Sequence, residues 1–222
     1  KNNHNKIIAG THIRRFNHAV TLNAAKTQRG FIGGRQLVLN IVDLDSISRA
    51  QANVNYFANE AIIALWDFLA AFPSVRHRWI LAVFRAYKFP EGFLLFLEAL
   101  LHFNYALYSS RGFQCFLYLI LTGIIQGCPS AGLVFAVAID PFLREMERLQ
   151  NVKLPPSSGS PSKCHPKRIK HFAFRACADD IGAALSSYKL LALVKPIFVK
   201  AEFFAGLKFG IPKCVIIPSA SS

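Results

Sequence analysis

The sequence predicts an α+β domain in which helices cover one face of an antiparallel sheet. The 222 residues are 53% hydrophobic, which is enough for one sizeable core. Short apolar runs with strand character occur in pairs joined by tight turns. Segments with helical spacing of apolar residues lie between them. Strand pairs interleaved with helices are typical of the α+β class.

The first half of the chain combines one strand with several helices. A basic, polar start is followed by a glycine-bearing turn at 28–36, and Leu37, Ile41 and Leu44 then repeat at helical spacing. The apolar run 61–68 predicts a short strand, and a helix follows over 70–87, with one apolar face formed by Val75, Trp79, Ala82 and Val83. Pro90 and Glu91 suit the first turn of a further helix over 93–105.

The second half contains two hairpins. The first joins 105–109 to 114–121, and the second places Asp179 and Asp180 in a two-residue turn between two apolar strands. Residues 151–170 contain four prolines, four serines and five basic residues, which predicts a flexible basic loop. The remaining elements are a helix over 131–149 with Phe135, Ile139 and Phe142 in its apolar stripe, a helix over 189–207 and a strand over 214–217.

Composition narrows the choice of partners and of compartment. A net charge of +14 and a pI near 9.9 favour a polyanion, either nucleic acid or an anionic membrane surface. The mean hydropathy is +0.31, but no apolar run approaches the roughly 18 residues of a bilayer span, so we expect no stable membrane association. Five irregularly spaced cysteines and the absence of a signal-peptide pattern favour a reducing, intracellular compartment. The oligomeric state is left open.

Three of the twelve acidic residues lie in apolar surroundings. Asp67 ends the strand at 61–68, and Asp179 and Asp180 occupy the turn of the second hairpin. If these strands are neighbours in one sheet, the three carboxylates converge at one edge. A solvated helix or loop face explains the other nine, which are Asp43, Asp45, Glu60, Glu91, Glu98, Asp140, Glu145, Glu147 and Glu202.

Converging carboxylates on a basic protein favour two-metal phosphoryl transfer with Mg²⁺ or Mn²⁺, in which two cations about 4 Å apart stabilise the attacking and leaving oxygens. Adjacent aspartates are poorly placed to flank a sugar from opposite sides, which argues against glycosidic chemistry. The alternative without a metal is that Asp67 caps a helix and the aspartate pair only favours a turn. A zinc site is a weaker candidate, with the irregularly spaced ligands Cys164, His165, His171 and Cys177.

Two glycine-bearing turns are candidate binding segments. In the turn at 28–36, backbone amides together with Arg29 and Arg35 could hold phosphate, although surface arginines on an ordinary loop explain the pattern equally well. In the turn at 123–129, Gln126 and Gly127 lie just ahead of a helix.

Five segments in order resemble motifs of reverse transcriptases of non-LTR retrotransposons, within the family of right-hand palm polymerases. They are QRGFIGGRQ (28–36), WDFLAAFPSVRHRWI (66–80), GIIQGCPSAGLVF (123–135), ACADDIGAAL (176–185) and GLKFGIPKC (206–214). The resemblance implies partial fingers over 1–60 and a palm over 61–222, with a ferredoxin-like antiparallel sheet backed by helices. We expect no thumb, and therefore weak binding of the duplex.

The implied activity is RNA-directed DNA synthesis, in which dNTPs are added to a DNA primer on an RNA template, with two Mg²⁺ or Mn²⁺ ions and a nuclear location. Asp67 and Asp179 match the principal metal ligands, and Asp180 matches a weaker one. Lys213 matches a lysine that protonates pyrophosphate. Phe72 matches the aromatic residue that excludes a 2′-hydroxyl. The other expected nucleotide-binding residues are Phe68, Gln126, Gly127 and Arg35.

Some positions depart from the family pattern. Pro73 replaces a frequent aspartate, Cys177 stands where an aromatic residue usually precedes Ala-Asp-Asp, and Ser130-Ala131 replaces Leu-Ser. These departures support the alternative of a truncated, non-catalytic retroelement remnant that at most binds nucleic acid.

Overall fold

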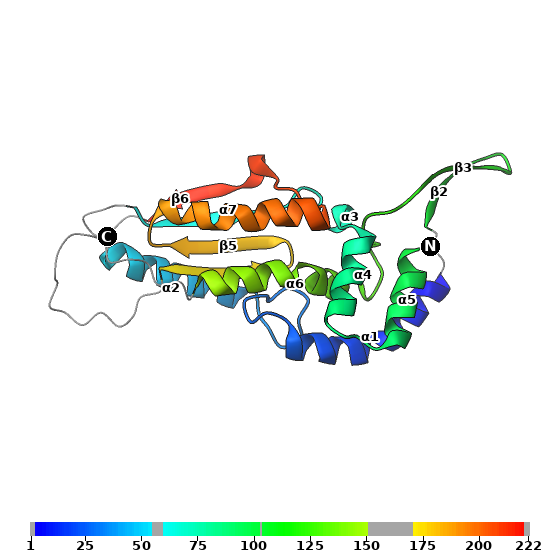
Figure 1. Cartoon of the computed structure of the whole chain (residues 1–222), viewed down its shortest axis with the longest axis horizontal. Helices are drawn as coiled ribbons and strands as arrows, with labels where there is room; N and C mark the ends of the chain where they lie inside the picture. Colours follow the sequence, from blue (N-terminus) through cyan, green and yellow to red (C-terminus); the bar gives the residue numbers. More distant parts are fainter. Residues whose placement is uncertain (1–2, 55–59, 103, 151–170, 220–222) are drawn as a thin grey trace.

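The fold is built on a four-stranded antiparallel sheet with the strand order β4-β5-β1-β6 (Figure 1). The computed structural model describes residues 3–54, 60–102, 104–150 and 171–219. The predicted α+β class is confirmed, whereas the predicted basic loop at 151–170 lies outside the described residues. The division into fingers and palm stays a prediction. The strands are β1 (Ile62–Trp66), β4 (Phe172–Cys177), β5 (Asp180–Leu185) and β6 (Val215–Pro218).

Helices α6 (Ala131–Leu149) and α7 (Leu191–Lys200) cover one face of the sheet (Figure 1). Side chains alternate along each strand, so every second residue points to this face. Phe174 of β4 and the predicted stripe residues Phe135 and Ile139 of α6 are fully buried. Each such side chain contributes about 2 kcal/mol through burial. After α7 the chain forms a π-helical turn at Ala201–Ala205 that ends at Gly206, where φ is +79°.

Helix α2 (Val38–Val54) covers part of the second face, which the one-sided sheet of the sequence analysis did not include. The predicted apolar stripe is wrong in part, because Leu37 and Ile41 are 51% and 65% exposed and only Leu44 is buried. The helix instead turns Asn40 and Gln51 toward the sheet. Their side-chain amides donate to the carbonyls of Ala176 and Ala184, at 3.1 and 3.3 Å. These hydrogen bonds satisfy the donor groups of both amides, whereas the buried Oδ1 of Asn40 has no hydrogen-bond partner among the described residues.

A bundle of helices completes the other end of the molecule. It contains α1 (Asn3–Asn23), α4 (His77–Ala86) and α5 (Glu91–Leu101), which share a cluster of phenylalanine rings that includes Phe16, Phe84 and Phe93. The predicted helix over 70–87 is interrupted after α3 (Ala71–Ser74). Val75 is extended there because it accepts a backbone hydrogen bond from Gly123, while Arg76 donates one to Ala205. This break shifts the buried face, and Ala82 is exposed.

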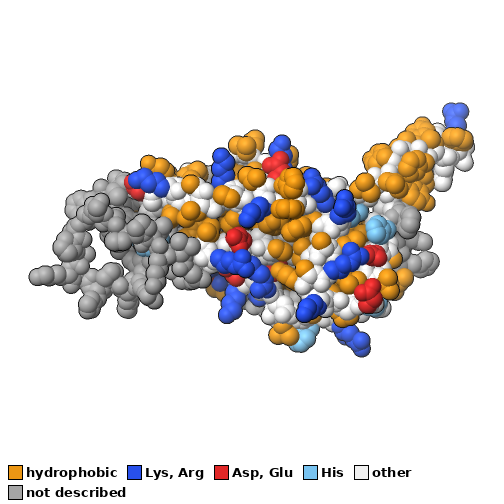
Figure 2. Space-filling model, in the orientation of Figure 1, with side chains coloured by type: hydrophobic (Ala, Val, Ile, Leu, Met, Phe, Trp, Pro, Cys, Tyr) orange, Lys and Arg blue, Asp and Glu red, His pale blue; other side chains and the backbone are white. Residues whose placement is uncertain are grey.

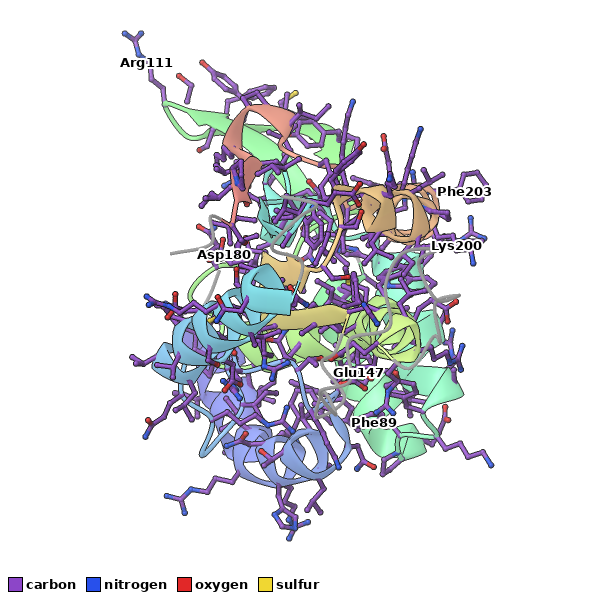
Figure 3. All side chains as sticks on the ribbon, turned by 90° about the vertical axis from the view of Figure 1, so that its left-hand side faces the viewer. Phe89, Arg111, Glu147, Asp180, Lys200 and Phe203 are labelled. Atoms are coloured by element: carbon purple, nitrogen blue, oxygen red, sulfur yellow. The ribbon has the colours of Figure 1, made fainter. Side chains whose placement is uncertain are left out.

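Strands β2 (Tyr105–Ser110) and β3 (Phe113–Leu119) form the predicted first hairpin, which projects from the body as an arm (Figure 1). Arg111 lies at its tip (Figure 3). The arm is largely apolar although it is exposed (Figure 2), through Tyr105, Leu107, Tyr108, Phe113, Phe116, Leu117, Tyr118 and Leu119. In the part of the chain that the structure describes, every helix is too short or too polar to cross a membrane.

Candidate functional site

The turn between β4 and β5 carries two of the predicted carboxylates. Cys177 pairs with Asp180, so the two turn residues are Ala178 and Asp179. The expected Asp179-Asp180 turn is therefore wrong by one residue. Asp180 instead begins β5 and is exposed. Ala178 adopts the left-handed conformation, with φ of +58°, which is uncommon for residues other than glycine.

The sheet brings the third carboxylate to the same edge. Strands β1 and β5 are neighbours, and Trp66 pairs with Ile181. Because the strands are antiparallel, the next residues along them, Asp67 and Asp180, lie beside each other. Both line a cleft of about 600 Å³ between α2 and β6. Figure 3 labels Asp180. Asp67 and Asp180 therefore present oxygen ligands to a common space.

Lys213 lies next to these carboxylates. Its Nζ forms an ion pair with Oδ2 of Asp67 at 2.9 Å, and the hydrogen bond raises the pKa of Lys213. The 3₁₀ turn Ile211–Lys213 is tied to the end of β1, because the backbone N–H of Gly210 donates to the carbonyl of Asp67 at 2.9 Å. The structure thus joins the predicted motif around Lys213 to the predicted first catalytic motif.

Asp179, one of the three predicted carboxylates, has a raised pKa. Burial raises the pKa of its carboxyl, and the negative charges of Asp180 and Asp67 raise it further, against the opposing effect of Lys213. A bound cation would relieve this repulsion. Hard oxygen ligands suit Mg²⁺, which usually takes one or two carboxylates from a protein and completes its shell with water and phosphate. Asp67 and Asp180, which line the same cleft, are two carboxylates of this kind, and Asp179 lies in the adjoining turn.

Among the described residues, no three His, Cys, Asp or Glu side chains are grouped as a ready-made set of metal ligands. Asp67 is instead paired with Lys213. For the zinc candidate, Cys164 and His165 lie outside the described residues, while Nδ1 of His171 lies 3.1 Å from Oγ of Ser186.

We expect Asp179→Asn to raise the thermal midpoint of the metal-free protein at pH 7. An acid whose pKa is higher in the folded state stabilises the fold fully below its ordinary value of 3.8, and this stabilisation is lost as the pH rises through the folded pKa. Asparagine cannot ionise, so the variant does not lose this stabilisation at high pH. Its thermal midpoint should therefore equal that of wild type near pH 3 and exceed it at neutral pH. Thermal unfolding monitored by circular dichroism in EDTA at both pH values measures it, and an unchanged midpoint at pH 7 would contradict it.

Three of the predicted nucleotide-binding residues share a second cavity. Phe72, Gln126 and Gly127 line a space of about 570 Å³, together with Phe31 and Arg14. The ring of Phe72 is stacked on Phe135 with centroids 4.4 Å apart, and it meets the edge of Phe31 at 5.9 Å. Phe31 was missed by the sequence analysis, although it lies within the matched segment 28–36.

The other two predicted nucleotide-binding residues, Phe68 and Arg35, lie outside this cavity. The ring of Phe68 is 4% exposed and stacks with Phe209 in the core. The guanidinium of Arg35 donates to four backbone carbonyls, with the Nη1 bonds to Ala25 and Gln28 at 2.5 and 2.6 Å. Both side chains are thus engaged in holding the protein together, and neither lines the cavity of Phe72.

Asp140 is a carboxylate that the sequence analysis placed wrongly on a solvated face. It is 1% exposed. Oδ1 accepts from the backbone N–H of Ala25 at 2.6 Å, and Oδ2 accepts from Tyr87 and Arg144 at 2.5 and 2.6 Å. Burial and this hydrogen bond raise the pKa of the Tyr87 hydroxyl. Asp140 therefore joins α6, α4 and the loop after α1, and it lies outside the cleft of Asp67.

Similarity to known proteins is found at the level of structure. Family models and curated proteins gave no sequence match. Two structures of apo telomerase from Candida tropicalis superpose with TM-scores of 0.64 and 0.65 at 9% and 8% identity, covering 94% and 96% of this chain. The same telomerase in complex with a TWJ fragment of telomeric RNA gives 0.62 at 10% identity over 94% of this chain. The chain has a telomerase-like fold.

At 8% to 10% identity the likeness concerns the fold alone. The chain spans between 33% and 40% of the length of these telomerase chains.

Proposed function

We propose that the chain is the polymerase core of an RNA-directed DNA polymerase that transfers nucleotides from dNTPs to a DNA primer. The observation that carries the proposal is the placement of Asp67 beside Asp180, with Asp179 in the adjoining turn, at the edge of a telomerase-like sheet. The five matched motifs further favour a non-LTR retrotransposon origin.

The carboxylates and Lys213 have separable tasks in this proposal. Asp67, Asp179 and Asp180 would hold Mg²⁺, which when bound supplies charge stabilisation for the attacking and leaving oxygens. Lys213 neutralises Asp67 in the resting protein, where the two groups are 2.9 Å apart. Release of this ion pair frees Nζ, which carries a proton suited to the departing pyrophosphate.

The cavity of Phe72 is the proposed nucleotide site. Its aromatic wall suits a base or sugar ring, and the exposed turn at Gln126 and Gly127 lies ahead of α6. Arg14 in the same lining supplies positive charge for phosphate. The Ala178-Asp179 turn lies close to this cavity in the chain's packing, because Gly30, next to Phe31, lies against the backbone of Ala178. Asp180, which follows the turn, lines the carboxylate cleft.

The proposed macromolecular partners are an RNA template and a DNA primer. The net charge of +14 favours a polyanion, and the face in Figure 2 carries more Lys and Arg than Asp and Glu. One telomerase structure with this fold holds a fragment of telomeric RNA. Nuclear location is part of the same proposal.

Primer extension tests the proposed function. The chain at micromolar concentration, a DNA primer annealed to an RNA template, dNTPs and Mg²⁺ are mixed at low salt, which favours binding to phosphate. We expect template-directed extension that stops when EDTA is added. No incorporation with either Mg²⁺ or Mn²⁺, on RNA that the chain demonstrably binds, would refute the proposal.

A second candidate function is nucleic-acid binding without catalysis. It is favoured by the Lys213–Asp67 ion pair, which occupies one of the proposed metal ligands. Salt-dependent RNA binding without nucleotide incorporation would support this candidate over the polymerase.

We expect Phe72→Val to raise the ratio of ribonucleotide to deoxynucleotide incorporation by about tenfold or more. The Phe72 ring is fixed against Phe135, so a smaller side chain opens room for a 2′-hydroxyl. Steady-state incorporation of a matched rNTP and dNTP measures the ratio. Phe203→Val, which truncates a ring that is 69% exposed, is the control and should leave the ratio unchanged. An unchanged ratio in Phe72→Val would remove Phe72 from this role.

A further inference from the structure

We propose that Gln28 is a positioning residue that holds the Ala178-Asp179 turn in place for the reaction. This inference rests on the proposed polymerase function. It adds to the proposed catalytic site a residue that lies 150 positions before Ala178 in the sequence. Gln28 lies on the loop between α1 and α2, and its side chain is 0% exposed.

A single side chain satisfies the backbone of the turn. Oε1 of Gln28 accepts hydrogen bonds from the N–H groups of Ala178 and Gly30, at 2.9 and 2.8 Å. Nε2 donates to the carbonyl of Ala178 at 3.2 Å. Ala178 is 7% exposed, so without Gln28 its N–H and C=O would be buried without these partners.

The backbone around Gln28 fixes the position of its side chain. Ala176 donates to the carbonyl of Thr27 at 2.9 Å, and Arg29 donates to the carbonyl of Ala176 at 2.8 Å. The loop thus forms a short parallel bridge to β4. A Cβ atom at Gly30 would lie 2.2 Å from the nitrogen of Ala178, so only glycine permits this approach.

The conformation of the turn needs such support. Ala178 is held at a φ of +58°, which is unfavourable for alanine and persists only where surrounding contacts impose it. The Gln28 contacts oppose relaxation of this conformation, because they fix the peptide groups on each side of Ala178.

The test compares Gln28→Met with Gln51→Met. Gln51 is a matched control because it is also a fully buried glutamine whose amide donates to the same hairpin, at the carbonyl of Ala184 near the far end of β5. Two measurements are made on each variant: hydrogen–deuterium exchange of the segment 176–181, and kcat and KM for dNTP in primer extension.

In Gln28→Met we expect exchange in 176–181 to accelerate at least about tenfold, and kcat to fall at least about tenfold while KM for dNTP changes less than about threefold. In Gln51→Met the thermal midpoint should fall, but exchange in the turn and kcat should stay near wild type. Equal effects of the two variants on turn exchange and on kcat would overturn the proposal.

Gln28→Glu serves if Gln28→Met does not fold. The glutamate side chain keeps an acceptor oxygen for the N–H groups of Ala178 and Gly30. When ionised, it can no longer donate a hydrogen bond to the carbonyl of Ala178. Faster exchange at the turn than in wild type is expected, and wild-type exchange with wild-type kcat would overturn the role of Gln28. Wild-type protein that fails to extend a primer refutes the polymerase function, whereas the exchange comparison still decides whether Gln28 holds the turn.

Discussion

Asp179→Asn is expected to lower the rate of nucleotide incorporation by about 1,000-fold while the protein stays folded. Asparagine occupies nearly the same volume but carries no charge, so it removes a metal ligand of the proposed reaction. The repulsion from Asp180 and Asp67 disappears at the same time, which is why folding is not impaired. Single-turnover primer extension at saturating dNTP and Mg²⁺ measures the rate.

The control for this prediction is Asp45→Asn. Asp45 lines the cleft of Asp67 and Asp180, but its exposed carboxylate pairs with Arg49 of the same helix at 2.9 Å. We expect its incorporation rate to stay within about threefold of wild type. If Asp179→Asn retains wild-type activity, the proposed catalytic group is wrong even if the chain polymerises DNA.

Asp140→Ala is expected to destabilise the fold by about 3 kcal/mol. The substitution leaves the Ala25 N–H, the Tyr87 hydroxyl and the Arg144 guanidinium without their shared acceptor, at a position that is 1% exposed. A loss of this size is a large part of the net stability of a typical domain. Urea unfolding followed by circular dichroism measures the free energy of unfolding.

Glu145→Ala on the same helix is the matched control. Its ion pair with Arg148 is exposed, with side-chain exposures of 39% and 80%, so we expect a change below about 0.5 kcal/mol. A loss as small in Asp140→Ala would show that the three hydrogen bonds of Asp140 contribute little to stability.

Local sequence patterns predicted most of the strands and helices around the candidate site. The strand ending at Asp67, the two hairpins and helix α6 all follow from apolar spacing. The pairing of β1 with β5 was only a condition in the sequence analysis, and the structure shows it. The position of the turn between β4 and β5 does not follow from local patterns. An Asp-Asp turn is the better local choice, but Gln28 stabilises the left-handed Ala178 from a distance in sequence that no local pattern reveals.

The buried polar groups were missed for the same reason. Asp140 looks like a solvated helix residue until α4 and the loop after α1 are placed against it. Asn40 and Gln51 interrupt the apolar pattern of α2. They nevertheless lie on its buried face, because their amides donate to carbonyls of the sheet. The Lys213–Asp67 pair likewise joins residues that are far apart in the sequence, and only the resemblance suggested that they share a site.

The projecting arm makes the state of this protein depend on salt in two ways. A two-stranded ribbon with apolar side chains and two unpaired edges is a template for pairing with another chain. At low salt, repulsion between molecules of charge +14 keeps such edges apart. Raising the salt screens this repulsion at the same time as it weakens binding to phosphate. Self-association should therefore rise as salt is added, while the proposed binding to nucleic acid falls. Competition with a polyanion at low ionic strength would release nucleic acid without promoting self-association.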